Sequence, residues 1–298
     1  MSDGIVLIDK PPGWTSHDVV ARSRRVLGTR KVGHAGTLDP MATGLLVLGV
    51  NRATRLLTYL VGADKEYLTT IRLGQDTLTD DAEGEVTRTS GIGSEGGRDV
   101  HDRLEASIAT LRGPIEQVPS SVSAIKVDGK RSYARVRGGE EVTLAARPVT
   151  VHTFEVLAIH PARTEDGIEV LDVEARVECT SGTYVRALAR DLGRALGTGG
   201  HLRALRRTRV GDFAVADAQP LTRETAQLRM LDVATVLRAA FPVRELTDEE
   251  TRELRFGRRL AATGTGEVTA ALAPDGRGIA LVQDDGGRAR PVLVLDPA

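Results

Sequence analysis

One short loop holds the residues best suited to chemistry. Residues 33–44 read GHAGTLDPMATG, and the three glycines and one proline predict a tight turn. Asp39 stands in this turn, five residues after His34. A rigidly held carboxylate can act as a nucleophile or as a general base. The same residues could also form a purely structural turn in which Asp39 accepts backbone N–H bonds, so the loop alone leaves both interpretations open.

A second candidate site lies at residues 179–193, which read CTSGTYVRALARDLG. We predict that a strand ends there at a Ser-Gly-Thr turn, which caps a helix. Tyr184 and Arg186 fall in the first turn of that helix, where an aromatic ring and a guanidinium can face one pocket. Tyr67, in a Lys-Glu-Tyr triplet at the start of a strand, is a third candidate. For both tyrosines, packing in the core is the alternative role.

Periodicity and capping residues predict the elements that must position these side chains. The predicted helices span residues 16–27, 51–61, 101–112, 183–197 and 247–256. The predicted strands span residues 4–9, 45–50, 66–73, 119–127, 147–159, 168–179, 266–272, 278–283 and 290–295. Residues 88–100 are rich in Gly and Ser and predict a surface loop. The sequence changes in character after residue 241, which predicts two domains, 1–230 and 242–298.

Charge is balanced over the whole chain and unbalanced along it. The 298 residues include 40 Lys and Arg against 41 Asp and Glu, a formal net charge of −1. The stretch from Tyr184 to Val210 contains seven arginines and one aspartate, which gives a local charge of +6. Between Thr79 and Glu105 the local charge is −5. A basic stretch can bind phosphates whatever the total charge, although it could equally be a solvated helix face.

Several classes of protein are excluded. The single cysteine, Cys179, allows neither an intrachain disulfide nor a multi-cysteine zinc site. The first residues lack the pattern of a signal peptide, and the densest apolar run, 45–50, is far shorter than the ~20 residues of a membrane helix. The glycines at 91–96 match a dinucleotide fingerprint, but no apolar strand precedes them. We therefore expect a cytoplasmic protein that uses no metal and no small-molecule cofactor.

Five segments, in this order and spacing, resemble the bacterial tRNA pseudouridine synthases of the TruB type. They are DKPPGWTS (9–16), residues 33–46, KEY (65–67), residues 181–192 and LRRT (205–208). A sixth segment, PSSVSAIKVDGK (119–130), is also similar to that family. The resemblance covers about residues 4–210. It implies an α/β (α+β) fold: a pseudouridine-synthase-like catalytic domain with a mixed, largely antiparallel sheet, and a small, β-rich, PUA-like C-terminal module for binding RNA.

The resemblance implies an isomerase that converts uridine to pseudouridine in the T loop of tRNA, at position 55. The partner is then the T stem-loop of tRNA, and we expect a monomer with no membrane attachment. By position, Asp39 matches the catalytic aspartate, and Arg186 matches the arginine paired with it. His34 matches the histidine that occupies the space left by the target base. Lys10 lies in a segment whose role in the family is structural support.

Three further positions match residues of the base pocket in this family. Tyr67 matches the tyrosine that stacks on the flipped base, and Tyr184 and Leu205 match other residues that line the pocket. The arginines at 186–209 would hold the phosphates. This sequence departs from the family after Leu73, where QDTLTDD (75–81) replaces a Thr-Asp-Thr-x-Asp-like stretch, so Asp81 is given no role.

Two rival functions stay open. One is a non-catalytic protein that binds or folds tRNA, in which the Asp39 turn is only structural. The other is an N-glycosidase, which also attacks C1′ of the sugar. Glycoside hydrolysis usually needs two carboxylates, and this turn offers one, so the glycosidase ranks lower.

Overall fold

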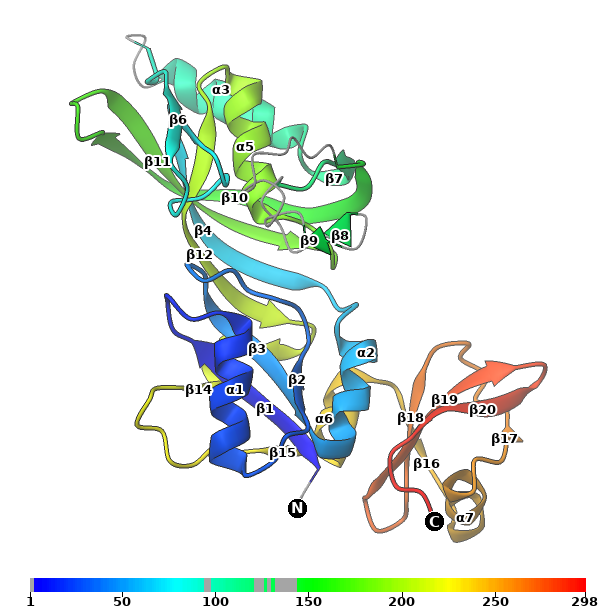
Figure 1. Cartoon of the computed structure of the whole chain (residues 1–298). Helices are drawn as coiled ribbons and strands as arrows, with labels where there is room; N and C mark the ends of the chain where they lie inside the picture. Colours follow the sequence, from blue (N-terminus) through cyan, green and yellow to red (C-terminus); the bar gives the residue numbers. More distant parts are fainter. Residues whose placement is uncertain (1–2, 94–97, 121–125, 128–129, 132–143) are drawn as a thin grey trace. The chain divides into compact units, whose positions relative to one another are not determined.

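The computed structural model describes residues 3–93, 98–120, 126–127, 130–131 and 144–298 (Figure 1). The chain forms two compact units, one made of residues 1–63 and 209–298 and the other of residues 64–208. Both ends of the chain therefore belong to the same unit. This division differs from the predicted boundary between residues 230 and 242, and that division into domains stays a prediction.

The first unit begins with an antiparallel strand pair. Strand β1 (Gly4–Lys10) pairs along its whole length with β3 (Thr43–Val50). Strand β2 (Val32–His34) adds to β3, while β14 (Gln219–Pro220) runs parallel to β1 and β15 (Leu231–Asp232) runs antiparallel to it. The apolar run of β1 is thus a buried strand, as the sequence predicts.

Helix α1 (Ser16–Leu27) covers the residues predicted for it. Thr15 and Asp18 form a reciprocal capping box at its start, and Gly28 ends it in the left-handed conformation at φ 64°. Val19 on its inner face packs with apolar residues of β1 and β3. These signals are local, which is why the sequence predicts the helix well.

Other elements of the first unit differ from the prediction. The predicted helix at 51–61 is a 3-10 turn, η1 (Asn51–Leu56), followed by a four-residue helix, α2 (Leu57–Leu60). The sequence analysis did not predict β2 or α6 (Val233–Ala240). The remaining elements before the C-terminal sheet are β13 (Phe213–Ala214) and η2 (Val215–Asp217).

The C-terminal part of this unit is a five-stranded sheet in the order β16-β18-β19-β20-β17, with helix α7 (Asp248–Arg255). Its strands are β16 (Val243–Glu245), β17 (Leu260–Ala261), β18 (Thr269–Leu272), β19 (Gly278–Asp285) and β20 (Arg288–Val294). Leu281 and Leu293 of this sheet belong to the same core as Ile5 and Leu45. The predicted β-rich C-terminal part is confirmed.

The second unit is built on the strand order β12-β4-β11-β10-β7, with the pairs β4–β11, β11–β10 and β10–β7 all antiparallel. Figure 1 shows helices α3 and α5 side by side in this unit. The bounds are β4 (Lys65–Leu73), β5 (Gln75–Thr77), β6 (Val86–Thr89), α3 (Arg98–Ala109), β7 (Gly113–Gln117), β8 (Lys126–Val127), β9 (Lys130–Arg131), β10 (Arg147–Arg163), β11 (Glu169–Cys179), α5 (Val185–Leu196) and β12 (Gly200–Val210). The predicted mixed, largely antiparallel architecture is confirmed.

In the second unit, too, some elements differ from those predicted from the sequence. The Arg-rich segment that contains Leu205 is a strand, β12, which the analysis did not predict. Of the predicted strand 119–127, residues 126–127 form β8, and residues 121–125 lie outside the described residues. The analysis did not predict β7, which pairs with β10. The predicted loop 88–100 begins inside β6 and ends inside α3, and its residues 94–97 lie outside the described residues.

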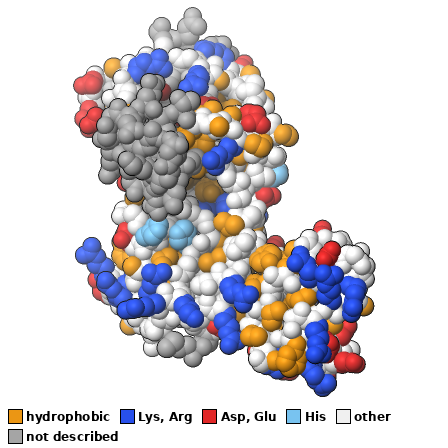
Figure 2. All heavy atoms as spheres, turned by 45° about the vertical axis from the view of Figure 1, so that its right-hand side comes forward, with side chains coloured by type: hydrophobic (Ala, Val, Ile, Leu, Met, Phe, Trp, Pro, Cys, Tyr) orange, Lys and Arg blue, Asp and Glu red, His pale blue; other side chains and the backbone are white. Residues whose placement is uncertain are grey.

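Within the described part of the chain, no helix is long and apolar enough to cross a membrane. On the face drawn in Figure 2, Lys and Arg side chains gather in several separate groups.

Candidate active site

The turn that carries Asp39 is held through its main chain, in the first unit. Ser16, buried at the start of α1, accepts a hydrogen bond from Leu38 N–H (2.9 Å) and donates one to Leu38 C=O (3.1 Å). On the other side of Asp39, Pro40 C=O accepts from Gly13 N–H at 2.9 Å. The main chain is thus held on both sides of the aspartate, which fixes where its side chain starts.

Lys10 strengthens the same turn. Its side chain is fully buried, and its ammonium donates to the carbonyl oxygens of Pro11 (3.0 Å), Trp14 (2.6 Å) and Pro40 (3.0 Å). An ammonium group has three N–H donors, and these three carbonyls can take all of them. Lys10 therefore ties the end of β1 to the residue after Asp39, as the expected supporting role requires.

His34 ends β2, five residues before Asp39. Its ring meets the ring of His17 edge to face, with 5.8 Å between centroids and 78° between planes. His17 lies on α1, the same helix whose Ser16 holds Leu38. The predicted site residues of the first unit, Asp39 and His34, are therefore carried by one connected group of elements.

In the second unit, α5 begins at Val185, two residues after the predicted start. Its N-cap is Tyr184, which forms no side-chain cap bond, so the predicted cap from the Ser-Gly-Thr turn is wrong. Gln117, at the end of β7, holds the N-cap residue instead: its side-chain oxygen accepts from Tyr184 N–H (2.8 Å), and its amide donates to Tyr184 C=O (3.1 Å). Gln117 is buried, so this pair holds the backbone of Tyr184 firmly.

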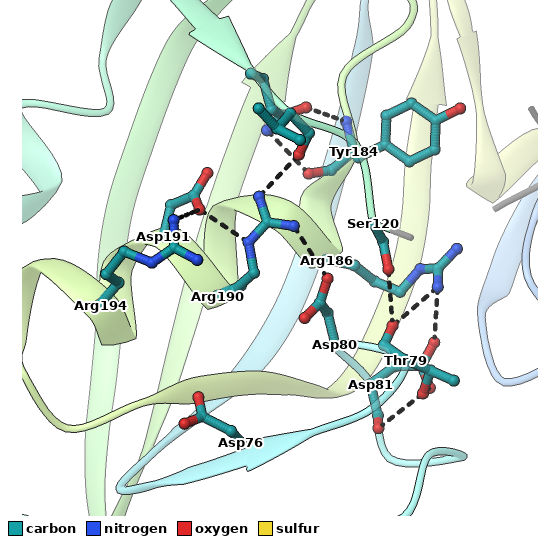
Figure 3. Close-up of polar contacts among 12 residues, drawn as sticks. Asp76, Thr79, Asp80, Asp81, Ser120, Tyr184, Arg186, Arg190, Asp191 and Arg194 are labelled. Carbon is teal, nitrogen blue, oxygen red and sulfur yellow. Dashed lines mark hydrogen bonds and ion pairs between the residues drawn. The ribbon is translucent and has the colours of Figure 1, made fainter. Parts of the chain in front are cut away.

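Arg186 follows two residues later and is buried. Figure 3 shows its side chain beside Asp81 and Thr79. Its guanidinium lies 3.3 Å from the Asp81 carboxylate and donates to Thr79 C=O at 2.9 Å. The side chains of Arg186 and Asp81 are only 7% and 4% exposed. Asp81, to which the sequence analysis gave no role, is therefore a buried partner of Arg186. The predicted pairing of Arg186 with Asp39 stays a prediction.

Asp81 is satisfied on its other oxygen as well. That oxygen accepts from the Thr79 hydroxyl (2.5 Å) and from Glu83 N–H (3.1 Å). Low dielectric strengthens such charged hydrogen bonds, and removing one partner is costly. The acidic residues at 75–81 indicated that a partner for an arginine could lie there. The sequence alone could not identify which arginine forms the ion pair.

Asp80, the neighbouring residue, pairs with the next turn of α5. Its carboxylate lies 3.2 Å from Arg190, which also binds Asp191 at 2.9 Å and donates to Val118 C=O at 2.8 Å. Asp80 has φ 60°, a conformation uncommon for residues other than glycine. Burial raises the pKa of Asp80 above its usual value, against the opposing effect of Arg190.

Tyr67 and Leu205 lie on adjacent strands, β4 and β12, and both are buried. The Thr69 hydroxyl, two residues along β4 from Tyr67, donates to Ala204 C=O at 2.8 Å. Successive side chains of a strand alternate between faces, so Tyr67 shares a face with Lys65 and Thr69. Burial and the charge of Arg207 lower the pKa of Lys65 to about 8.

Several arginines of the basic stretch, residues 184–210, are engaged in ion pairs within the protein. Ion pairs with aspartates involve Arg186, Arg190, Arg194 and Arg203 of this stretch. The acidic stretch provides two of these partners, Asp80 and Asp81. The basic and acidic stretches thus neutralise each other in part, because folding brings them together. Among the residues that the model describes, no group of three or more His, Cys, Asp or Glu is placed to hold a metal ion.

Comparison with known families decides the relationship. A family model described as "TruB family pseudouridylate synthase (N terminal domain)" matches residues 24–185. The chain belongs to the TruB family. Two C-terminal models of the same family match as well, tRNA pseudouridylate synthase B C-terminal domain at residues 186–245 and tRNA pseudouridine synthase II, C terminal, at residues 241–296.

Curated relatives of the family match over nearly the whole chain. The tRNA pseudouridine synthase B of Arthrobacter sp. (strain FB24) is 57% identical over 307 residues, covering 100% of this chain and 98% of that protein. The proteins of the same name from Streptomyces griseus and Mycobacterium leprae are 52% and 53% identical, and cover 98% and 100% of this chain and 97% and 92% of their own lengths.

Solved structures agree with the fold. The crystal structure of a Cbf5-Nop10-Gar1 complex contains a chain that is 26% identical, with a TM-score of 0.70, covering 99% of this chain and 85% of that one. The archaeal box H/ACA sRNP Nop10-Cbf5 complex contains one that is 25% identical, with a TM-score of 0.68, covering 99% and 86%. The predicted family, fold class and enzyme class, a pseudouridine synthase, are confirmed. The roles of the individual site residues stay predictions.

Proposed function

We propose that this chain isomerises uridine to pseudouridine in the T loop of tRNA, at position 55, with Asp39 as the catalytic residue. The observation that carries the proposal is the turn at Asp39, whose main chain is held on both sides by Ser16, Gly13 and Lys10. The full-length match to proteins named tRNA pseudouridine synthase B supports tRNA as the substrate. The proposal includes a cytoplasmic, monomeric enzyme, as the sequence predicts.

The reaction needs one well-placed reactive group. It breaks the bond from C1′ to N1, turns the base, and joins C1′ to C5. The C5 hydrogen leaves as a proton and N1 takes one up, so atoms and electrons balance without an oxidant or a group donor. Asp39 can add to C1′, add to C6 of the base, or remove a proton in an elimination. All three steps require a carboxylate that is held in a fixed position relative to the substrate, and the main-chain bonds of the turn support this.

Reaching the base costs energy, which the proposed pocket offsets. Turning a base out of a folded loop costs a few kcal/mol. Stacking on an aromatic ring returns about 1–3 kcal/mol per base. We assign this stacking to Tyr67, further contacts with the base to Tyr184 and Leu205, and the filling of the vacated space in the RNA to His34. Arg186, held by Asp81, would contribute a fixed positive charge.

The proposal is tested by tritium release from tRNA labelled at C5 of uridine. Wild type, Asp39→Asn and the control Asp217→Asn are compared, because Asp217 is an exposed aspartate of the same unit. We expect release by wild type and control, and at least a roughly 10³-fold slower rate for Asp39→Asn, with tRNA binding nearly unchanged. Full activity of Asp39→Asn would remove Asp39 from the mechanism.

Other outcomes identify the rival functions. If no protein releases label but all bind tRNA in a salt-sensitive way, the chain binds RNA without modifying it. Release of free uracil would indicate an N-glycosidase. A separate comparison of Tyr67→Ala with Tyr67→Phe tests stacking: the phenylalanine keeps the ring, so we expect the alanine variant alone to lose activity. Unchanged activity of Tyr67→Ala would make Tyr67 an ordinary core residue.

A further inference from the structure

A groove of about 580 Å³ lies on the first unit, along the outer face of α1. It is lined by Gly13, Trp14, Asp18, Ala21, Arg22, Arg25 and Arg223. Residues 18, 21, 22 and 25 follow the three- and four-residue spacing of one helix face, and Arg223 comes from the turn after β14. The groove therefore combines three guanidinium groups with one carboxylate.

Two of the three arginines are available to a ligand. Arg25 and Arg223 are exposed, and neither forms an ion pair or a hydrogen bond with any residue that the structure describes. Arg22 is different, because its guanidinium donates to Thr222 C=O (3.3 Å) and Thr225 C=O (2.7 Å). Arg22 thus fixes the turn that presents Arg223 beside the helix that presents Arg25.

The nearby carboxylates are engaged by other groups. Asp18 accepts from Thr15 N–H (2.9 Å) and from the Thr15 hydroxyl (2.6 Å) in the capping box of α1. Glu224, next to Arg223, forms no ion pair with Arg25 or Arg223 in the described part of the chain, and its pKa is lowered chiefly by the Thr222 hydroxyl. Neither acid therefore occupies the guanidinium of Arg25 or Arg223, and the groove keeps an excess of positive charge.

The groove also adjoins the proposed catalytic turn. Gly13, at one end of the groove, donates its N–H to Pro40 C=O, and Pro40 directly follows Asp39. Trp14, the next lining residue, accepts a hydrogen bond from the same Lys10 ammonium that binds Pro40. A ligand in the groove thus lies close to any substrate placed at Asp39.

We propose that this groove binds the phosphodiester backbone of the RNA strand that flanks the target uridine. Arginine binds phosphate oxygens through its planar array of N–H donors, and Arg25 and Arg223 provide two such groups. The choice of RNA rests on the proposed function, and this contact would extend the substrate site beyond the base pocket.

The test measures binding of a tRNA T stem-loop over about 0.05 to 0.2 M salt, where phosphate contacts dominate the salt dependence. Wild type is compared with Arg25→Ala/Arg223→Ala and with the control Arg163→Ala/Arg238→Ala, which also removes two exposed positive charges. Each lost contact with a single strand lowers the slope of log K against log salt by about 0.7, so we expect a loss of about 1.4 and roughly tenfold weaker binding. The control should keep the wild-type slope.

Two further measurements make the result specific. Trp14 is the only tryptophan of the chain and lines the groove, so RNA should change the fluorescence of wild type. Arg25→Lys/Arg223→Lys keeps both charges and should retain most of the binding, which guards against a folding defect. A wild-type slope in the alanine variant, or unchanged Trp14 emission with bound RNA, would overturn the proposal.

Binding and turnover are measured separately, so the two proposals can fail separately. If the slope falls as expected but no protein releases tritium, the proposed reaction is wrong and the groove remains an RNA-binding surface. If wild type releases tritium but the alanine variant binds and turns over RNA as wild type does, the proposed reaction stands and the RNA strand does not enter this groove.

Discussion

The turns at Asp39 and at Asp80–Asp81 present carboxylates in two different ways. At Asp39, Ser16 and Lys10 bind the main chain on either side of the aspartate. At Asp81, the bonds go to the carboxylate itself, which is buried against Arg186 and also accepts from Thr79 and Glu83. The bonds described at the first turn hold the main chain on either side of Asp39, whereas those at the second turn hold the Asp81 carboxylate itself.

This difference separates the roles of the two turns. A carboxylate whose oxygens are taken by an arginine, a hydroxyl and an amide is suited to hold an arginine in place. A turn fixed through its main chain can position a side chain that must act on a substrate. We therefore expect changes at Asp81 to act on stability first, and changes around Asp39 to act on rate first.

The largest effect on stability is expected for Asp81→Ala. Removing one partner of a buried ion pair takes the Asp81 carboxylate away from the Arg186 guanidinium, and we expect the free energy of unfolding to fall by about 3 kcal/mol. Asp39→Ala, measured beside it by urea unfolding, should change stability by less than about 1 kcal/mol. Equal losses of unfolding free energy in the two variants would contradict the different roles assigned to the two turns.

A smaller effect is expected for Lys10→Met. The variant keeps the length of the side chain but leaves three carbonyl groups without their donor, while it also removes a buried charge. These effects partly cancel, so we expect a loss of about 2 kcal/mol together with a lower kcat, because Pro40 is no longer held. The exposed Lys31→Met is the matched control and should match wild type in both measurements. A destabilised variant with wild-type kcat would show that the turn does not need Lys10 for its geometry.

Ser16→Ala tests the other side of the turn. Its hydroxyl serves both the N–H and the C=O of Leu38, and we expect its loss to cost about 1–2 kcal/mol. The informative readout is the split between kinetic constants, with kcat lowered and KM for tRNA nearly unchanged. For comparison, Thr79→Val removes the hydroxyl bond to Asp81 and should affect stability alone. A change in KM without a change in kcat for Ser16→Ala would contradict the positioning role.

The smallest effect concerns the pH dependence of stability. Because burial raises the pKa of Asp80 in the folded state, its contribution to stability is present at low pH and is lost as the pH rises through the folded pKa. Asp80→Asn cannot ionise, and asparagine tolerates the positive φ, so this variant should lose less stability over the same rise, by under about 1 kcal/mol.

The pKa of Asp18, in the first unit, is shifted in the opposite direction to that of Asp80. Hydrogen bonds from Thr15 lower its pKa, so its contribution is present above the usual value of 3.8 and is lost as the pH falls through the folded pKa. Urea unfolding of wild type, Asp80→Asn and Asp18→Asn across the acidic range separates the two signs. If Asp80→Asn follows wild type at every pH, the Asp80 carboxylate does not control stability.

The sequence predicted much of the fold because many signals were local. Thr15, Asp18 and Gly28 bound α1 at the residues expected, since caps act within one helical turn. The glycines of the Asp39 turn predicted unusual backbone angles, and Gly36 (φ 89°) and Gly44 (φ 97°) have them. Strand β12 escaped prediction because its many arginines hide the apolar pattern, although Arg207 in it is buried.

By itself, then, the amino-acid sequence determined the family, the α/β class and the turn that presents Asp39, because ordered motifs, caps and glycines lie close together along the chain. Only the tertiary structure decided that Asp81 holds Arg186, that Lys10 and Ser16 hold the turn, and that the basic and acidic stretches pair. The reason is physical: charges and hydrogen-bond donors of one kind are interchangeable along a chain, and only folding selects which of them come within bonding distance.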